Sequence, residues 1–210
     1  MSKYFNVRRP YLKEIFGNNI RAIIPQIAMS AGTMMACSCS SILMGKQSSL
    51  GPFDPHVNGL SATRVIREFE RAVREAQDNP ACIPFWQAII SKYHPTFLEQ
   101  CDHAVERSSK IVTSWLMQNM LANNPDSKIT AETIVDYFTK TGADEEHSRH
   151  ISLKDALDVG LKIEKLESDQ ELQDLVLTVH HAYMHTFSQC QTLIKIIENH
   201  IGNGMFNFAN

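Results

Sequence analysis

Residues 21–58 read RAIIPQIAMSAGTMMACSCSSILMGKQSSLGPFDPHVN, and this stretch decides the fold. An apolar run ends at Pro25, small residues surround Ser30, and small residues and methionines with helical character follow. We therefore predict a buried strand over 21–25, a tight turn, and a helix whose first turn holds Ser30. A second apolar run over 41–44 predicts another strand. Because no hairpin signal separates the two strands, we expect parallel pairing through a right-handed crossover.

The position of Ser30 suits either chemistry or capping. A hydroxyl at a helix start lies at the positive end of the helix dipole, where unpaired N–H groups stabilise an anion. The small residues Ala28, Ala31 and Gly32 leave room for a substrate backbone to come close. An ordinary N-cap serine occupies the same position without any chemistry. The pattern therefore predicts a nucleophile only if a base and an orienting group are found.

Composition bounds the class of protein. A length of 210 residues predicts one domain over 1–210, with residues 1–10 expected to be flexible. A content of 43% hydrophobic and 20% charged residues is that of an ordinary globular protein. The net charge of −3 gives no reason to expect a nucleic-acid partner. No apolar run approaches the about 20 residues of a membrane span. Five cysteines without framework spacing fit a reducing cytoplasm.

The rest of the chain is mostly helical. We predict a turn-rich loop over 48–58, a polar loop over 139–148 and a short strand over 161–163. Apolar residues at helical spacing predict further helices over 62–77, 83–93, 95–122, 129–138, 153–157 and 170–201. The predicted fold class is α/β, rich in helix, with a small parallel sheet and several long helices.

Two segments resemble a known family. The sequence AMSAGTM at 28–34, followed by MGKQSSLGPFDP at 44–55, resembles the Clp-fold serine proteinases. The closest likeness is to the serine dehydrogenase proteinases, relatives of ClpP and of the signal peptide peptidase SppA. The segment HISLKDALDVGLKI at 150–163 resembles a late element of ClpP and SppA, and the likeness covers most of 18–200. The resemblance implies a ClpP/crotonase-like fold.

The resemblance also implies a catalytic triad. ClpP places its histidine about 25 residues after the serine, where this chain has Asp54 and His56. Serine dehydrogenase proteinases have the order Ser, Asp, His, which the chain matches with Ser30, Asp54 and either His147 or His150. Only mutual geometry matters to a triad, so this order is chemically sound. We predict Ser30 as nucleophile, Asp54 as orienter and His147 as base, with His150 and His56 as alternative bases.

Other readings of these residues stay open. Asp54 also fits a turn-forming Asp-Pro pair, and loop histidines are commonly solvated. SppA-like enzymes use a Ser-Lys dyad, but Lys46 follows Gly45 in a polar loop and reads as a surface residue. In the family one oxyanion donor comes from a Gly-Gly turn upstream of the nucleophile, and only Gly17 precedes Ser30. The chain therefore looks N-terminally shortened, with the backbone N–H groups of Ala31 and Gly32 as the expected donors.

A second constellation lies near the C-terminus. His181 and His185 are i,i+4 neighbours that could hold a metal. A zinc-protease motif needs a glutamate where residue 182 is Ala. We favour a packed or interface face for these histidines and predict no metal and no cofactor.

These observations predict a serine peptidase-like hydrolase that cleaves peptide bonds by acyl transfer. The alternative is an inactive or truncated Clp-fold assembly protein, since the upstream Gly-Gly strand is missing. The resemblance implies a homo-oligomer, because Clp-fold relatives form rings or layered assemblies. The expected partner is a peptide or protein substrate. The expected location is the cytoplasm, with membrane association left open by the resemblance.

Overall fold

The computed structural model describes residues 12–144 and 150–209. The predictions made for residues 1–10 and for His147 lie outside this range. Contacts divide the chain into two compact units, one ending at Lys165 and the other beginning at Leu166, and each is described by itself. This division does not test the single-domain prediction, which stays a prediction.

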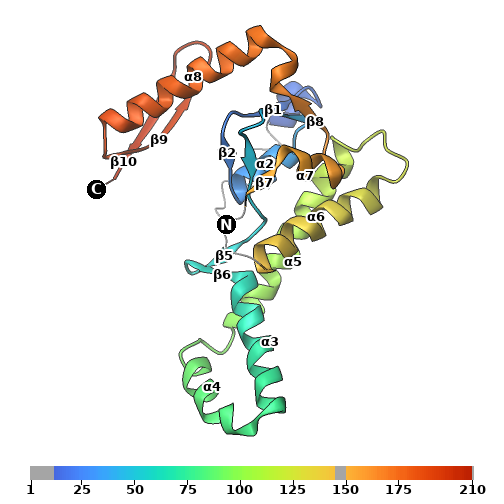
Figure 1. Ribbon diagram of the computed structural model, residues 1–210, viewed down its shortest axis with the longest axis vertical. Coiled ribbons are helices and arrows are strands. Elements are labelled where there is room, and N and C mark those ends of the chain that lie inside the picture. The colour runs from blue at the N-terminus through green and yellow to red at the C-terminus, as the bar shows by residue number, and fades with distance from the viewer. Residues whose placement is uncertain (1–11, 145–149, 210) are drawn as a thin grey trace. The chain divides into compact units, whose positions relative to one another are not determined.

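The central sheet of the first unit is parallel (Figure 1). It has the order β1-β3-β8, with β1 at Arg21–Ile24, β3 at Ser41–Met44 and β8 at Ile163–Lys165. Arg21 lies opposite Ser41, and Ile42 lies opposite Ile163. The first two strands and their parallel pairing are confirmed, but β1 is not the buried strand that was predicted, since only Ile24 of its four residues is buried. The third begins two residues later than predicted, because the Leu161 N–H still bonds the Ala156 carbonyl at 3.0 Å and closes the preceding helix.

A second small sheet was not predicted. Its order is β2-β4-β7, made of Ile27–Ala28, Ser49–Leu50 and Ile151–Ser152. β2 pairs with β4 in parallel, and β4 pairs with β7 antiparallel. Two-residue strands carry no alternation that a sequence can show.

The predicted 48–58 loop also runs into a hairpin. β5 (His56–Val57) pairs antiparallel with β6 (Leu60–Ser61). Asn58 and Gly59 have φ of 52° and 82°, as the two central residues of a type I′ turn require. The Asn-Gly pair was the signal for this hairpin, and the sequence interpretation missed it.

Helices make up most of the first unit. A helical turn over 12–16 and the short η1 (Pro80–Cys82) accompany six longer segments. These are α2 (Ala31–Cys37), α3 (Ala62–Asp78), α4 (Ile83–Ile90), α5 (Phe97–Gln118), α6 (Ser127–Asp144) and α7 (Leu153–Asp158). All six were predicted, most within a few residues. The polar loop predicted from residue 139 is wrong as far as Asp144, since α6 continues there with an i,i+4 ion pair from Lys140 to Asp136 at 2.7 Å.

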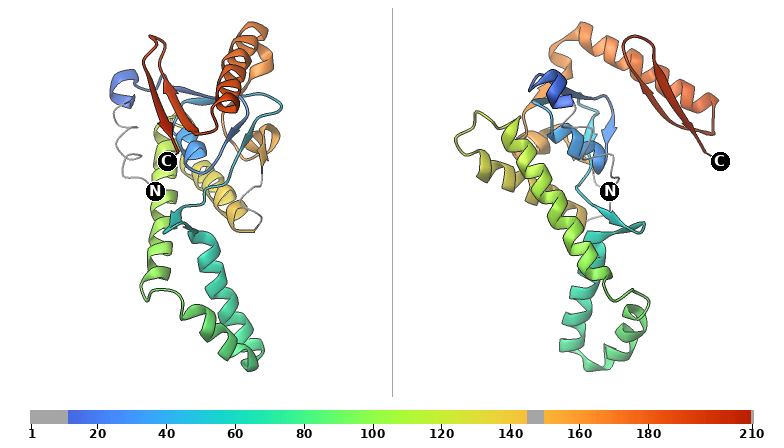
Figure 2. Two further views of the ribbon diagram at one scale, coloured as in Figure 1. Left: turned by 90° about the vertical axis from the view of Figure 1, so that its left-hand side faces the viewer. Right: turned by 180° about the vertical axis from the view of Figure 1, so that it is seen from behind.

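The core of this unit lies between the sheets and the helices. Residues of β3, α2, α5 and α6 form one buried apolar cluster, and α5 packs along both α6 and α3 (Figure 2). The most deeply buried side chains include Ile42, Met44, Leu116, Ile134 and Phe138. A smaller cluster between α3 and α5 contains Val65, Phe97 and Cys101. Helix-rich α/β architecture with small sheets is therefore confirmed.

The second unit is a helix with a hairpin. It contains η2 (Leu166–Ser168), α8 (Gln170–Gln189) and the antiparallel pair β9 (Leu193–Glu198) and β10 (Gly204–Phe208), as Figure 1 shows. The single helix predicted over 170–201 is therefore wrong beyond Gln189. The side-chain oxygen of Asn199 accepts hydrogen bonds from the Ile201 and Asn203 N–H groups and so forms a turn. The helical spacing used for the prediction does not detect such a turn. Within the described residues, no helix is both long and apolar enough to cross a membrane.

Candidate functional site

Ser30 sits in a strained turn between β2 and α2. The Gly32 N–H bonds the Met29 carbonyl at 2.7 Å, and Ser30 has φ 44° and ψ −108°. These angles match the first central position of a type II′ turn, where glycine is the usual residue. A serine with positive φ costs on the order of 1–3 kcal/mol and persists only where its surroundings enforce it. Such outliers cluster at functional sites.

Ser30 does not cap the helix that follows it. Its hydroxyl makes no capping hydrogen bond to α2, although its carbonyl accepts the first helical bond from Met34 at 3.0 Å. The hydroxyl instead points to the backbone carbonyl of Asp54, with 3.4 Å between the oxygens. An N-cap serine has extended angles and bonds the second or third N–H of its helix. The capping interpretation therefore does not fit.

The turn is fixed from the side of β4. Gly51 donates its N–H to the Ala28 carbonyl at 2.7 Å and approaches Thr33 Oγ1 at 3.2 Å. A Cβ on Gly51 would lie 3.2 Å from the Met29 Cα and closer still to the Met29 sulfur. Glycine at this position therefore allows the end of β2 and the residue after β4 to approach each other directly beside Ser30.

Asp54 is a buried carboxylate held by hydroxyl groups. Its side chain has no exposed surface. Ser61 Oγ and Thr63 Oγ1 each donate a hydrogen bond to Asp54 Oδ1 at 2.8 Å. The other oxygen, Oδ2, lies 3.7 Å from Nε2 of the half-exposed His56. Asp54 thus combines a carbonyl that receives Ser30 Oγ with a carboxylate next to an imidazole.

Two of the three candidate histidines, His56 and His150, lie among the described residues. His56 contacts Asp54 through the 3.7 Å approach of Nε2 to Oδ2. His150 is exposed, and its Nδ1 hydrogen-bonds Ser49 Oγ at 2.8 Å. His147, the predicted base, lies outside the described residues, so its role stays a prediction.

Phe138 of α6 and the start of β7 both lie near the Ser30–Asp54 region. Phe53, next to Asp54, donates its N–H to the Phe138 carbonyl of α6 at 3.1 Å, and the two rings stack at 4.8 Å. In the small sheet Ala28 pairs with Leu50, which pairs with Ile151. The chain therefore enters β7 at the same end of the sheet at which it leaves β2 toward Ser30. Since neighbouring strands are about 4.8 Å apart, these two ends are about 10 Å apart.

The two predicted oxyanion donors differ. The Gly32 N–H is already engaged by the Met29 carbonyl. The Ala31 N–H occupies the first position of α2, where helix amides have no intrahelical acceptor. Only Ala31 is therefore kept as a candidate donor. Lys46 is exposed and lacks the burial that a Ser-Lys dyad needs.

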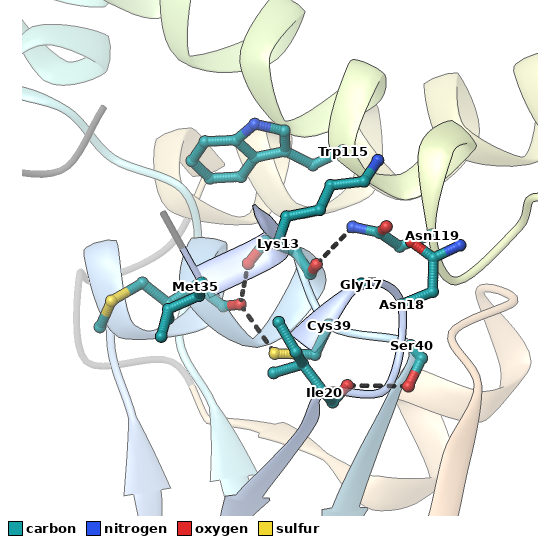
Figure 3. A pocket seen from close by; sticks show the side chains of 11 residues that line it. Lys13, Gly17, Asn18, Ile20, Met35, Cys39, Ser40, Trp115 and Asn119 are labelled. Carbon is teal, nitrogen blue, oxygen red and sulfur yellow. Dashed lines mark hydrogen bonds between the residues drawn. The ribbon is translucent and has the colours of Figure 1, made fainter. Parts of the chain in front are cut away.

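Two pockets lie near the two ends of this region. An open pocket of about 430 Å³ includes His56 and Ser61, which contact Asp54, and is also lined by Arg64, Glu68 and Tyr93, among others. A mostly apolar one of about 100 Å³ lies at the opposite end of α2 (Figure 3). There Asn119 donates to the Ser38 carbonyl at 2.7 Å, and Ser40 donates to the Ile20 carbonyl at 2.7 Å.

The histidines predicted as a possible metal pair lie in the second unit. His181 and His185 of α8 are both exposed. Across residues 12–144 and 150–209, no group of three His, Cys, Asp or Glu side chains is placed to hold a metal ion. Packing inside the chain does not account for these histidines, and an interface role stays a prediction.

Sequence reasoning named Ser30, Asp54 and His56 as candidates and did not name Ser61 and Thr63, which contact Asp54. The two hydroxyl residues stand at the start of a predicted helix, where such residues are expected as caps. Their contact with Asp54 depends on the turn at Asn58-Gly59, so only a predicted hairpin could have revealed it.

Comparisons with known proteins find a match over the part of the chain that contains these residues. Residues 12–92 match a family described as ClpP-like SDH-type serine proteinase. The chain is also 32% identical over 63 residues to the uncharacterized protein MJ0137 of Methanocaldococcus jannaschii, a match that spans 30% of this chain and 22% of that protein. No solved structure matches the chain. The chain is therefore similar to ClpP-like SDH-type serine proteinases over the stretch that contains Ser30, Asp54 and His56.

Proposed function

We propose that this protein is a serine hydrolase that cleaves peptide bonds by acyl transfer, with Ser30 as nucleophile, Asp54 as orienter and His147 as base. The observation that carries the proposal is the turn at Ser30. Ser30 has a glycine-like conformation, and its hydroxyl points to the Asp54 carbonyl and does not cap the helix, so capping does not explain its strain. Similarity to ClpP-like serine proteinases over the same residues supports the same function.

The proposed reaction has two steps. The base removes the Ser30 Oγ proton as Oγ attacks the substrate carbonyl carbon, and it then protonates the leaving amine. The Ala31 N–H at the start of α2 donates to the developing oxyanion. Water, deprotonated by the same base, then hydrolyses the acyl-enzyme and releases Ser30. Asp54 holds the imidazole in the tautomer and orientation that both proton transfers require.

His147 is proposed as base on two grounds. It follows the altered triad order Ser, Asp, His that the sequence resemblance implies. Support comes from Phe138 of α6, which bonds the residue next to Asp54, and from Ile151, which lies at the Ser30 end of the small sheet. His56 is the alternative, because its Nε2 lies 3.7 Å from Asp54 Oδ2. His150 is the weakest candidate, because Ser49 already engages its Nδ1.

A non-catalytic assembly protein on the same fold is the second candidate. It is favoured by the Gly32 amide, which is bonded to Met29 and leaves a single proposed oxyanion donor. Loss of one donor typically lowers the rate about 10²–10³-fold. The ClpP/crotonase-like fold, the relation to SppA and a homo-oligomeric state are parts of the proposal that belong to either candidate.

The test is turnover of a mixed peptide library by purified variants. We expect Ser30→Ala to abolish cleavage and His147→Gln to lower it by about 10³-fold or more. His56→Gln, His150→Gln and the control His94→Gln, an exposed histidine that contacts Thr96, should each stay within about tenfold of the wild type. If His56→Gln loses activity and His147→Gln keeps it, the base is His56. Undiminished cleavage by Ser30→Ala refutes the proposed function.

A further inference from the structure

Two hydroxyl groups donate hydrogen bonds to the same oxygen of a buried carboxylate. Ser61 Oγ and Thr63 Oγ1 both donate to Asp54 Oδ1 at 2.8 Å, and Thr63 and Asp54 are 5% and 2% exposed. We infer that Ser61 and Thr63 are positioning residues, which turn Asp54 so that Oδ2 faces an imidazole. This inference rests on the proposed function, because it assigns Asp54 the orienting role.

Neighbouring groups favour donation from Ser61 to Asp54. Ser61 Oγ accepts the Arg64 N–H at 3.2 Å, as the N-cap of α3, so its single proton is left to donate to Asp54. Thr63 Oγ1 lies 3.1 Å from Ser61 Oγ in the first turn of the same helix. The Ala62 N–H also bonds the Pro55 carbonyl at 2.9 Å and joins the helix start to the residue after Asp54. The donors and the acceptor therefore belong to one rigid loop.

Loop closure alone does not explain a carboxylate at this position. The oxygen of an asparagine side chain accepts the same two hydrogen bonds without a charge to bury. Burial of a charged group is costly unless other groups compensate it, so a structural role alone would favour the amide. The charge becomes useful where it faces the imidazole that gains a proton during reaction, which the proposed function assigns to His147, with His56 as the alternative. His56 Nε2 lies 3.7 Å from Asp54 Oδ2, so the imidazole of His56 also reports on the orientation of this carboxylate.

The experiment compares Thr63→Val with Thr63→Ser in the full chain. Valine keeps the buried volume and removes the donor, and serine restores it. Ser108→Ala is the matched control, because Ser108 is also buried and bonds the Val105 carbonyl of its own helix. The readouts are kcat and KM for a cleaved peptide, the melting temperature, and the imidazole signals of His56 in proton–nitrogen NMR spectra, assigned with His56→Gln.

We expect Thr63→Val to lower kcat by about 10- to 100-fold with KM nearly unchanged, and Thr63→Ser to recover most of the loss. The His56 imidazole signal should shift in Thr63→Val, return in Thr63→Ser and stay in place in Ser108→Ala. If Thr63→Val does not fold, Ser61→Ala removes the other donor and supplies the same comparison.

The outcomes separate this inference from the proposed function. Wild-type protein without turnover refutes the proposed function, and the His56 signal then decides whether the hydroxyls position Asp54. An active wild type whose kcat and His56 signal are both unaffected by Thr63→Val refutes the inference alone. A lowered melting temperature with unchanged kcat and unchanged His56 signal also overturns it, because it assigns the hydroxyls to loop stability.

Discussion

At the scale of single residues, the candidate site contains two residues whose local structure is unfavourable for stability. Ser30 adopts a positive φ that suits glycine, and Asp54 buries a carboxylate. Each is a local conflict of the kind that folded proteins keep where function requires it. The sequence predicted both residues from motif and resemblance. It could not predict the strain, because φ depends on the Gly32–Met29 hydrogen bond that closes the turn.

Strain at Ser30 predicts that glycine is more stable than alanine at this position. Glycine adopts a positive φ without steric strain. The free energy of unfolding of Ser30→Gly in denaturant should therefore exceed that of Ser30→Ala by about 1 kcal/mol, although both variants lack the nucleophile. An alanine variant as stable as the glycine variant would show that the turn is relaxed.

Asp54→Asn should separate orientation from packing. The amide oxygen keeps both bonds from Ser61 and Thr63, so the free energy of unfolding should fall by no more than about 1 kcal/mol. Loss of the carboxylate should lower kcat by about 10³-fold or more, as for other triads. Unfolding curves and steady-state kinetics on the same preparation check this. A strongly destabilised but active variant would contradict the orienting role.

At the scale of elements, the spacing of apolar residues along the sequence predicted the long helices of the first unit well. The apolar face of α3, with Val65 buried, shows the i, i+3, i+4 spacing that such predictions use. The two-residue strands β2, β4 and β7 gave no such signal, although they carry the register that brings Ser30 and the start of β7 to one sheet end. β9 was predicted as helix because four of the six residues of Leu193–Glu198 are apolar, and so short a run matches either period.

The junction between α3 and the segment before α5 contains a pH-sensitive contact. Tyr93 donates to Glu68, and this bond raises the pKa of Tyr93 to about 12 from an ordinary value of 10.0. The protonated hydroxyl is the stabilising form. Its contribution is therefore complete below pH 10 and is lost as pH rises toward 12.

We expect Tyr93→Phe to weaken the fall in stability between pH 10 and 12. Tyr137→Phe is the matched control, because no hydrogen bond of its hydroxyl occurs among the described residues. Unfolding midpoints in denaturant at several pH values test this. Identical pH profiles for the wild type and Tyr93→Phe would exclude the contribution.

At the scale of the whole molecule, both buried apolar clusters belong to the unit that ends at Lys165. The candidate site, from Ser30 to Thr63, lies in the same unit. Composition and length predicted one domain and gave no sign of a boundary at Leu166, since no linker-like run of glycine, proline or serine precedes it.

This arrangement predicts that residues 1–165 fold alone. The fragment should unfold cooperatively with a melting temperature within about 5 °C of the full chain, and it should keep any reactivity of Ser30. Circular dichroism in the near ultraviolet and thermal melts are the measurements. A fragment without fixed aromatic signals would show that residues after Lys165 complete the core.

The central claim is that Ser30 is an activated nucleophile. The most direct measurement is reaction of the native protein with a fluorophosphonate, with the modified residue located by peptide mass spectrometry. Ser38→Ala, at the other end of α2, is the matched control for Ser30→Ala. We predict one adduct on Ser30, retained in Ser38→Ala and absent from Ser30→Ala. An adduct on another serine, or equal labelling of the wild type and Ser30→Ala, would contradict the claim.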